Sequence, residues 1–451
     1  MPVNRMLATL RSLVPEGRIA RSVLLLGGST AMAQLIGMAA MPLVTRLYTP
    51  AEIGTVSLFL SFFLLWANSL SLRYEYALLI ARDDAESHVL LRLGTLLVLI
   101  MSVLGLPLLW ALRHFRILEF DRLPAATFLF VLPTFAGHGL FMLHRAWALR
   151  GGLFKDITQT SMARAAANAG TKVALGLVGG GILGLLTAEL AGACLAMARL
   201  MRAARRHFAA SRPENIACAQ LAAAAAKYRK SALLETPSTW INALALTLPL
   251  PLVAELYGVP AAGWFGLARL VVGAPNGQLG AAVADVFQRE LARAMAAGDH
   301  ARARSLFYKL LRNLALVGLA PLIVVITLSP SVFPLVFGAA WSEAGPVAAC
   351  LAPWLYAAFI VSPLSRALSV LQAQEWKLAY DLSAVGLLLA AFSLAATCGL
   401  SLTGFCLLLS TANILGYTVY GLVLVRTIAK QGRPGPPCGP TTGDGAEDRL
   451  K

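Results

Sequence analysis

The chain has 451 residues, of which 58% are hydrophobic and 13% are charged, and its formal net charge is +16. Soluble domains usually contain about 25% charged residues, so this composition excludes an ordinary soluble protein. A large positive charge can indicate a nucleic-acid partner, but in membrane proteins basic residues collect on cytoplasmic loops, so we predict no nucleic-acid binding. The 6 cysteines lack the spacing of a disulfide framework or a zinc site, and neither a metal nor a cofactor is predicted.

Apolar stretches with few charged residues follow one another along most of the chain. Each is close to the roughly 20 residues that cross a bilayer as a helix. Barrel strands would alternate apolar and polar residues, so the pattern predicts an all-α polytopic membrane protein with about 12 transmembrane helices. The predicted helices span about 22–45, 53–72, 91–112, 123–143, 157–177, 179–198, 233–254, 262–285, 307–329, 345–367, 377–398 and 402–425.

These helices form two groups of six, separated by a basic segment with an alanine run that predicts a surface helix. The last residues are rich in proline, glycine and charge, so they cannot bury a core and are predicted to be disordered. The predicted organisation is a basic cytoplasmic N-terminus (1–21), an N-lobe with helices 1–6 (22–200), a cytoplasmic linker (201–230), a C-lobe with helices 7–12 (231–428) and a disordered cytoplasmic tail (429–451).

Lysine and arginine are unevenly distributed between the predicted loops. With a cytoplasmic N-terminus, about 31 of the 38 lysines and arginines fall on cytoplasmic segments. Both termini are therefore predicted to be cytoplasmic. The outer loops are short, and the largest, RHFRILEFDRL, is too small for an external catalytic domain.

A repeat relates the two halves of the chain. A shift of 209 residues aligns 12 identities within 37 gapless positions. Six helices return the chain to the same side, so the lobes are predicted to be related by a pseudo-two-fold axis along the membrane normal, with a central cavity between them. Leucine matches carry little weight, and the informative pairs are Pro42 with Pro251, Tyr48 with Tyr257 and Gly54 with Gly263.

The repeated stretches PLVTRLYTP and PLVAELYGV differ in charge at one position. Arg46 in the first corresponds to Glu255 in the second, at the outer end of the first helix of each lobe. We predict that these two side chains form an outer gate, approaching one another when the outer side closes. The alternative is that both are ordinary interfacial charges.

The fifth predicted helix carries a polar face of Arg164, Asn168 and Lys172. Spacings of four residues place these side chains on one side of a helix. Ionisable groups at mid-membrane are costly and normally face a cavity or a partner, so two cations here indicate a site for an anion such as a diphosphate. Arg269 in the eighth helix is a further candidate. The alternative is that these cations snorkel to an interface.

Several acidic residues lie in or near the predicted helices. Glu189, Glu235 and Asp381 could pair with these cations, or one of them could bind a coupling ion. Arg73 and Glu75, at the inner end of the second helix, are interpreted as a structural ion pair. No HExxH motif and no nucleophilic triad is present, and GLVGGGILG follows a membrane helix and not a strand, so the sequence predicts neither an enzyme nor a nucleotide site.

Two long stretches resemble a known family. LLGGSTAMAQLIGMAAMPLVTRLYTPAEIGTVSLFLSF, followed by RYEYALLIARDDAES, resembles the opening of Wzx-type oligosaccharide flippases of the multidrug/oligosaccharidyl-lipid/polysaccharide exporter superfamily. The stretch that begins KYRKSALLETPSTWINALALTLP and ends GQLGAAVADVF resembles that family's second half. Relatives often carry an arginine one residue after Arg269, where this chain has Leu270, which weakens the assignment of Arg269.

The resemblance implies translocation of undecaprenyl-diphosphate-linked oligosaccharides across the bacterial inner membrane, for O-antigen, lipopolysaccharide or exopolysaccharide synthesis. It also implies a monomer that works with a polysaccharide polymerase and glycosyltransferases, and a basic cavity in which Arg164, Lys172 and Arg269 are the candidates. A lipid II flippase or a multidrug exporter of the same superfamily remains an alternative. A membrane glycosyltransferase or polymerase, or an assembly subunit without transport, is a further alternative.

Overall fold

The computed structural model describes residues 18–208, 216–229, 232–233, 236–371, 373 and 375–430. These residues are helical and include no strand. The elements are α2 (Arg18–Leu47), α3 (Pro50–Ala67), α4 (Tyr74–Ile80), α5 (Asp84–His114), η1 (Ile117–Arg122), α6 (Thr127–Arg150), α7 (Phe154–Leu177), α8 (Gly181–His207), α9 (Cys218–Lys227), α10 (Thr236–Thr247), α11 (Pro249–Tyr257), α12 (Val259–Ala296), α13 (His300–Phe337), η4 (Ala339–Trp341), α14 (Ala344–Leu364), α15 (Arg366–Val370), α16 (Glu375–Cys398) and α17 (Leu402–Lys430).

The predicted all-α multi-pass membrane fold is confirmed. Within the described residues, 10 helical segments are long and apolar enough to cross a membrane. The predicted spans that fall outside these ten correspond to α7 and α12, which have 24 and 38 residues but carry ionisable side chains. The predicted count of twelve therefore stays a prediction. The predicted tail lies almost entirely outside the described residues, as do residues 1–17 of the N-terminus and 209–215 of the linker.

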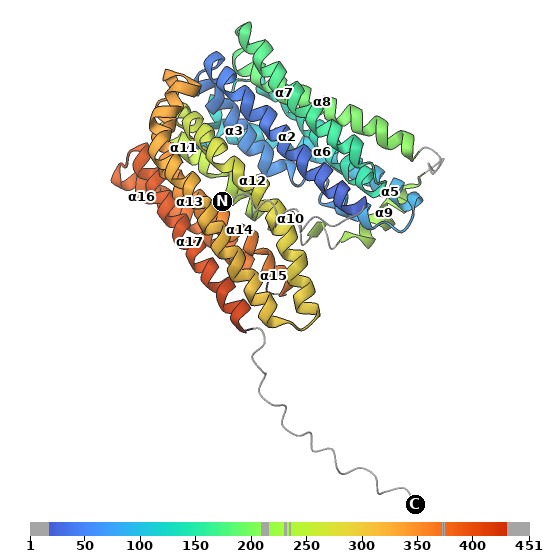
Figure 1. The fold of residues 1–451 in the computed structure, drawn as a ribbon. Coiled ribbons are helices and arrows are strands. Elements are labelled where there is room, and N and C mark those ends of the chain that lie inside the picture. The colour runs from blue at the N-terminus through green and yellow to red at the C-terminus, as the bar shows by residue number, and fades with distance from the viewer. Residues whose placement is uncertain are drawn as a thin grey trace, which may run out of the picture.

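The helices form two bundles inclined to one another, one from α2 to α8 and the other from α10 to α17 (Figure 1). Each bundle has its own hydrophobic core. Buried aromatic side chains fill the first core, among them Phe59, Phe135 and Trp147. The second bundle is filled in part by Phe265 and Trp341. Aromatic side chains bury large apolar areas, so each bundle is stabilised by packing within itself.

The predicted seventh span is present as one membrane-spanning stretch, Thr239–Tyr257, with a break in its helix. Helix α10 ends at Thr247, and α11 starts at Pro249. Proline has no backbone N–H, so it suits the first turn of a helix and removes a hydrogen bond from a continuing one, and Pro251 removes a second donor. The break separates α10, which contacts the N-lobe near Arg73, from α11, which packs on α3 and η1.

The predicted second span also ends early. Helix α3 stops at Ala67, and a turn leads to α4, in which Leu72 and Arg73 have φ angles of 47° and 66°. Non-glycine residues in this left-handed region cost of order 1–3 kcal/mol each, so surrounding contacts must hold them there. This turn borders the candidate site described below.

The two lobes touch where α3 crosses α12. A β-carbon on Gly54 would lie 2.1 Å from the carbonyl oxygen of Val259, and one on Gly263 would lie 2.1 Å from that of Pro50. Pro50 and Val259 are separated by the same 209 residues as Gly54 and Gly263. The contact is therefore reciprocal, as expected for two segments related by a two-fold axis, and it supports the repeat inferred from the sequence.

Further contacts join the lobes near this crossing. The indole Nε1 of Trp341 donates to the carbonyl oxygen of Thr45 at 2.8 Å, and both residues are buried. An apolar cluster also spans the boundary, with Leu58 from α3 packed against α11 and α12. The lobes are thus in close contact at the end of the molecule where α2 ends and α3 begins.

Candidate functional site

The polar face predicted on α7 is present and packs against α6 and α8. Asn168 donates its Nδ2 to the carbonyl oxygen of Ala188 at 3.3 Å. A β-carbon on Gly192 would lie 3.3 Å from the Arg164 carbonyl oxygen and from the Asn168 β-carbon, so glycine permits this close approach of α7 to α8. The structure therefore brings Arg164, Asn168 and Lys172 together, inside the N-lobe.

Lys172 has an acidic partner on α8. Its Nζ lies 2.8 Å from Oε1 of Glu189, and their side chains are 21% and 18% exposed. Removing one partner of a buried ion pair usually costs about 3–5 kcal/mol, because the other charge remains without compensation. The pair therefore neutralises the cation at Lys172 and also occupies the carboxylate that the sequence offered as an ion-coupling group.

Arg164 is the surplus cation of this group. Its Nη2 lies 3.4 Å from Nδ1 of His138, and its guanidinium stands over the Phe141 ring at 5.3 Å. Among the described residues, no ion pair includes Arg164. Arginine can only donate, so His138 accepts at Nδ1, and a neutral imidazole then carries its hydrogen on Nε2. No local pattern in the sequence indicated that His138 belongs to the site.

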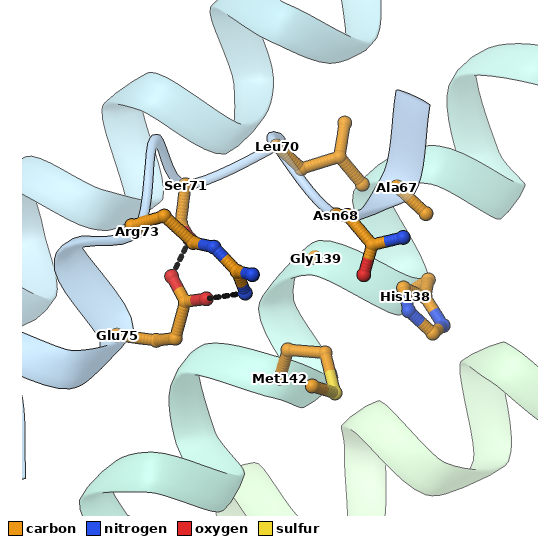
Figure 2. Close-up of a pocket in the computed structure, with 9 residues that line it drawn as sticks. All are labelled: Ala67, Asn68, Leu70, Ser71, Arg73, Glu75, His138, Gly139 and Met142. Carbon is orange, nitrogen blue, oxygen red and sulfur yellow. Dashed lines mark hydrogen bonds and ion pairs between the residues drawn. The ribbon is translucent and has the colours of Figure 1, made fainter. Parts of the chain in front are cut away.

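A pocket next to His138 extends the group toward the turn after α3. Figure 2 shows its lining, with the Arg73 guanidinium between Glu75 and Asn68, and with His138 across the pocket. Nη1 of Arg73 lies 3.4 Å from Oε1 of Glu75, and Ser71 donates to the other carboxylate oxygen. The predicted ion pair of Arg73 and Glu75 is present, and it lines the pocket together with Ala67, Asn68, Leu70, Ser71, His138, Gly139 and Met142.

The C-lobe candidates lie apart from this group. The Arg269 guanidinium on α12 is 6.0 Å from the centre of the Trp354 ring on α14. The buried carboxylate of Asp381 on α16 lies 3.5 Å from Nδ2 of Asn242 on α10. Glu235 lies outside the described residues. The substrate role of Arg269 and the ion-coupling role of Asp381 stay predictions.

The predicted gate residues are both exposed. Nη2 of Arg46 lies 3.4 Å from the carbonyl oxygen of Leu335 on α13, so this arginine does reach the opposite lobe. The ion pairs of the described residues do not include Arg46 with Glu255. The gate stays a prediction, with the Leu335 carbonyl as the partner of Arg46 in this conformation.

The arrangement has the chemistry of an anion-binding site. Guanidinium groups and an imidazole N–H are hydrogen-bond donors suited to phosphate oxygens. Among the described residues, no group of three or more His, Cys, Asp or Glu side chains is arranged to hold a metal ion. The fold defines a multi-pass membrane protein with a group of cations inside its N-lobe.

The chain belongs to the family described as polysaccharide biosynthesis protein, which matches residues 43–346. A search of curated proteins found no match. The family resemblance inferred from the sequence is thereby confirmed at the level of polysaccharide biosynthesis.

Solved structures share the fold at low sequence identity. An inward-facing multidrug resistance MATE family transporter of the MOP superfamily has a TM-score of 0.66 and 14% identity, covering 88% of this chain and 94% of its own. The lipid II flippase MurJ, in an inward closed conformation, has a TM-score of 0.66 and 11% identity, covering 90% of this chain and 89% of its own. A MOP superfamily transporter from Pyrococcus furiosus has a TM-score of 0.54 and 12% identity, with 91% and 96% covered.

Proposed function

We propose that the protein is a flippase that moves undecaprenyl-diphosphate-linked oligosaccharides from the cytoplasmic to the periplasmic leaflet of the bacterial inner membrane. The observation that carries the proposal is Arg164, a surplus cation inside the N-lobe of a transporter fold from a polysaccharide biosynthesis family. A cation at this depth is costly unless it faces a cavity or a partner. A lipid-linked diphosphate is an anionic partner of that kind.

In this proposal, the diphosphate is the group that the N-lobe recognises. Arg164 offers a planar guanidinium that suits two phosphate oxygens at once. Lys172 offers a second cation when the anion competes with Glu189. The glycan then occupies the polar space between the lobes, and the polyprenyl chain stays in the bilayer. The lobes rock about their contact to expose the site to either side, with both termini in the cytoplasm.

Export in a strain that lacks the chromosomal gene tests the assignment. Arg164→Ala with Lys172→Ala should lower surface polysaccharide at least tenfold and cause the lipid-linked glycan to accumulate facing the cytoplasm, because charged hydrogen bonds contribute about 1.5–3 kcal/mol each. Arg202→Ala, an exposed arginine on α8, is the matched control and should leave export unchanged. Normal export by the double variant, at normal protein level, would overturn the site assignment.

A lipid II flippase or a multidrug exporter is the competing function, because structures of both kinds share this fold. Each has a direct test. Rescue of growth after depletion of the cell's own lipid II flippase would favour lipid II, and increased resistance to cationic drugs would favour drug export. Surface polysaccharide that depends on the gene, without either effect, would favour the oligosaccharide flippase working with a polymerase and glycosyltransferases.

A further inference from the structure

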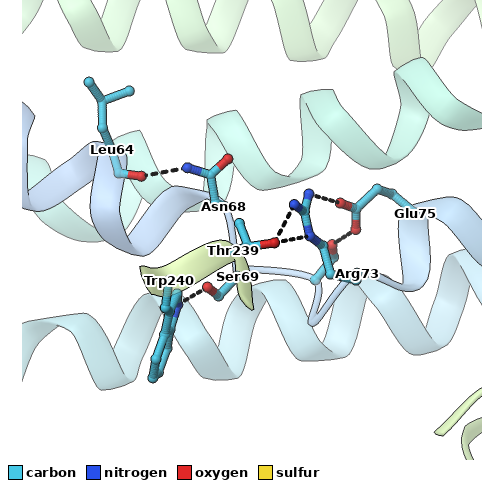
Figure 3. Close-up of polar contacts among 8 residues, drawn as sticks. Leu64, Asn68, Ser69, Arg73, Glu75, Thr239 and Trp240 are labelled. Atoms are coloured by element: carbon cyan, nitrogen blue, oxygen red, sulfur yellow. Dashed lines mark hydrogen bonds and ion pairs between the residues drawn. The ribbon is translucent and has the colours of Figure 1, made fainter. Parts of the chain in front are cut away.

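The turn between α3 and α4 holds the N-lobe to the start of α10 in the C-lobe. Nε and Nη2 of Arg73 both donate to Oγ1 of Thr239, at 3.1 and 2.5 Å. The Trp240 indole donates to Oγ of Ser69, and its ring stacks on Trp66 at 5.6 Å. Figure 3 shows Thr239 and Trp240 lying side by side along this turn. We call this set of contacts the inner latch.

The backbone of the turn is strained where the inner latch is made. Leu72 and Arg73 are consecutive non-glycine residues with positive φ. Such conformations persist only where surrounding contacts hold them, and they occur often at switch regions. Thr239 and Glu75 are the groups that hold the Arg73 side chain in this position. A change of partner at Arg73 therefore acts directly on a strained segment.

Arg73 is held across the lobe boundary by a neutral acceptor. The hydroxyl of Thr239 accepts two of its hydrogen bonds, while the carboxylate of Glu75 lies at 3.4 Å, at the long end of the range. An anionic acceptor adds a Coulombic attraction to the guanidinium that a neutral hydroxyl cannot supply. An anionic oxygen that reaches Arg73 can therefore displace the threonine.

The pocket brings the surroundings of Arg73 next to those of the candidate site. Arg73 and His138 line the same pocket, and Nδ1 of His138 lies 3.4 Å from Nη2 of Arg164 (Figure 2). The histidine that contacts Arg164 thus also lines the pocket of Arg73, within the same lobe. A phosphate held by Arg164 would therefore lie next to the lining of that pocket.

We propose that Arg73 couples phosphate binding to separation of the lobes, by exchanging Thr239 for an oxygen of the lipid diphosphate and so releasing the inner latch. This inference rests on the proposed function. Glu75 keeps Arg73 oriented during the exchange. In the absence of ligand the inner latch holds the α3–α4 turn against α10. A ligand shifts a conformational equilibrium only if it binds one state more tightly, and the diphosphate does so here by binding the state in which Arg73 is free of Thr239.

Two variants that weaken the same hydrogen bond from opposite sides test the exchange. Arg73→Gln keeps a donor for Thr239 but loses the charge, so undecaprenyl diphosphate should bind about tenfold more weakly. Thr239→Val releases Arg73 and keeps its charge, so binding should strengthen by roughly three- to tenfold, because the competent state is more populated. Arg82→Gln, an exposed arginine in the α4–α5 turn, is the matched control and should change nothing. Binding is measured on the full chain in lipid nanodiscs.

A purely structural Arg73 would make both variants shift binding in the same direction, and that result would overturn the proposal while the proposed function stood. Failure of the parent protein to bind undecaprenyl diphosphate would overturn both. Inorganic diphosphate in place of the lipid separates recognition of the headgroup from recognition of the chain. If undecaprenyl diphosphate binds and inorganic diphosphate does not, and if the two variants still shift binding of the lipid in opposite directions, the exchange is supported at a site that also recognises the polyprenyl chain.

Hydrogen exchange of residues 66–76 gives an independent readout of the inner latch. Undecaprenyl diphosphate should raise exchange in this segment of the parent protein and leave it unchanged in Arg73→Gln. Thr239→Val should show the raised exchange without ligand. Protection of the segment on binding, or an equal response in Arg73→Gln, would contradict the release of the inner latch.

Discussion

Replacing Gly54 with alanine tests the contact between the lobes at the α3–α12 crossing. The new methyl carbon would lie 2.1 Å from the Val259 carbonyl oxygen, whereas ordinary contact begins at 3.4 Å, so the helices must separate by about 1.3 Å, the difference of the two. Overpacking of this kind costs about 1–3 kcal/mol. Alanine returns about 1 kcal/mol through its higher helix propensity.

Gly266→Ala is the matched control, because it lies on α12 and also faces α3, with its nearest neighbours at an ordinary 3.5 Å. This variant should gain the helix propensity without the clash. We expect Gly54→Ala to be less stable than Gly266→Ala by about 1–3 kcal/mol, the overpacking term alone. Thermal unfolding of both proteins in the same nanodiscs measures the difference, and hydrogen exchange of residues 50–58 shows whether the crossing has loosened.

The reciprocal contact of Gly54 and Gly263 also predicts the behaviour of the double variant, Gly54→Ala with Gly263→Ala. Gly263→Ala should behave as Gly54→Ala does, because its β-carbon meets the Pro50 carbonyl oxygen at the same 2.1 Å. One separation of the helices relieves both clashes, so the double variant should lose less stability than the sum of the two. The reasoning is refuted if Gly54→Ala unfolds at the temperature of Gly266→Ala, or if the two glycine variants add in full.

Three further outcomes follow from contacts elsewhere. Glu189→Gln should destabilise the fold by about 3–5 kcal/mol by leaving Lys172 without its partner, measured by thermal unfolding; an unchanged unfolding temperature would contradict the ion pair. Trp341→Phe removes the hydrogen bond to Thr45 between the lobes and should cost about 1–3 kcal/mol, with raised exchange at the end of α2; unaltered exchange there would contradict it. The hydrogen bond to Glu86 raises the pKa of Lys227. The stability that Lys227 gains from this hydrogen bond is therefore fully present below the usual lysine pKa of about 10.4. It is lost only as pH rises through the raised pKa of Lys227 in the folded protein. Protection of the α9 amides from hydrogen exchange should stay constant from pH 6 to 9, once the rates are corrected for intrinsic exchange. The same protection should be lower in the Lys227→Met variant.

Local patterns were enough to predict most of the fold. An apolar run long enough to cross a bilayer must satisfy its own backbone hydrogen bonds, so it forms a helix wherever it is placed. The breaks were harder to locate. The sequence placed a helix boundary near Cys398, where Gly399 takes a positive φ and α16 ends. It also placed one span over α10 and α11, but it did not predict the break between Thr247 and Pro249 within that span. Proline inside an apolar stretch either bends a helix, as Pro42 does in α2, or separates two helices, and neighbouring packing decides which.

The candidate site was predictable only in part. The helical period placed Arg164, Asn168 and Lys172 on one face, because spacing along a helix is a local property. Glu189 was one of three acidic residues expected to pair with these cations or to bind an ion, and only the structure shows that it pairs with Lys172. His138 was not expected there, since it comes from another helix and no local pattern links it to α7. Their contacts changed the interpretation from two free cations to one ion pair and one surplus arginine.

The repeat separates what the sequence could predict from what only the tertiary structure could show. The sequence by itself determined that the chain is a membrane protein built of helices and that its halves echo one another at Gly54 and Gly263, because hydropathy and identity can be read residue by residue. Only the tertiary structure decided that these two glycines meet at the lobe boundary, and that Arg73 spans the same boundary to Thr239. Contacts between segments far apart in the chain depend on how the two bundles pack, and packing is set by the whole surface of each bundle and not by any one stretch of sequence.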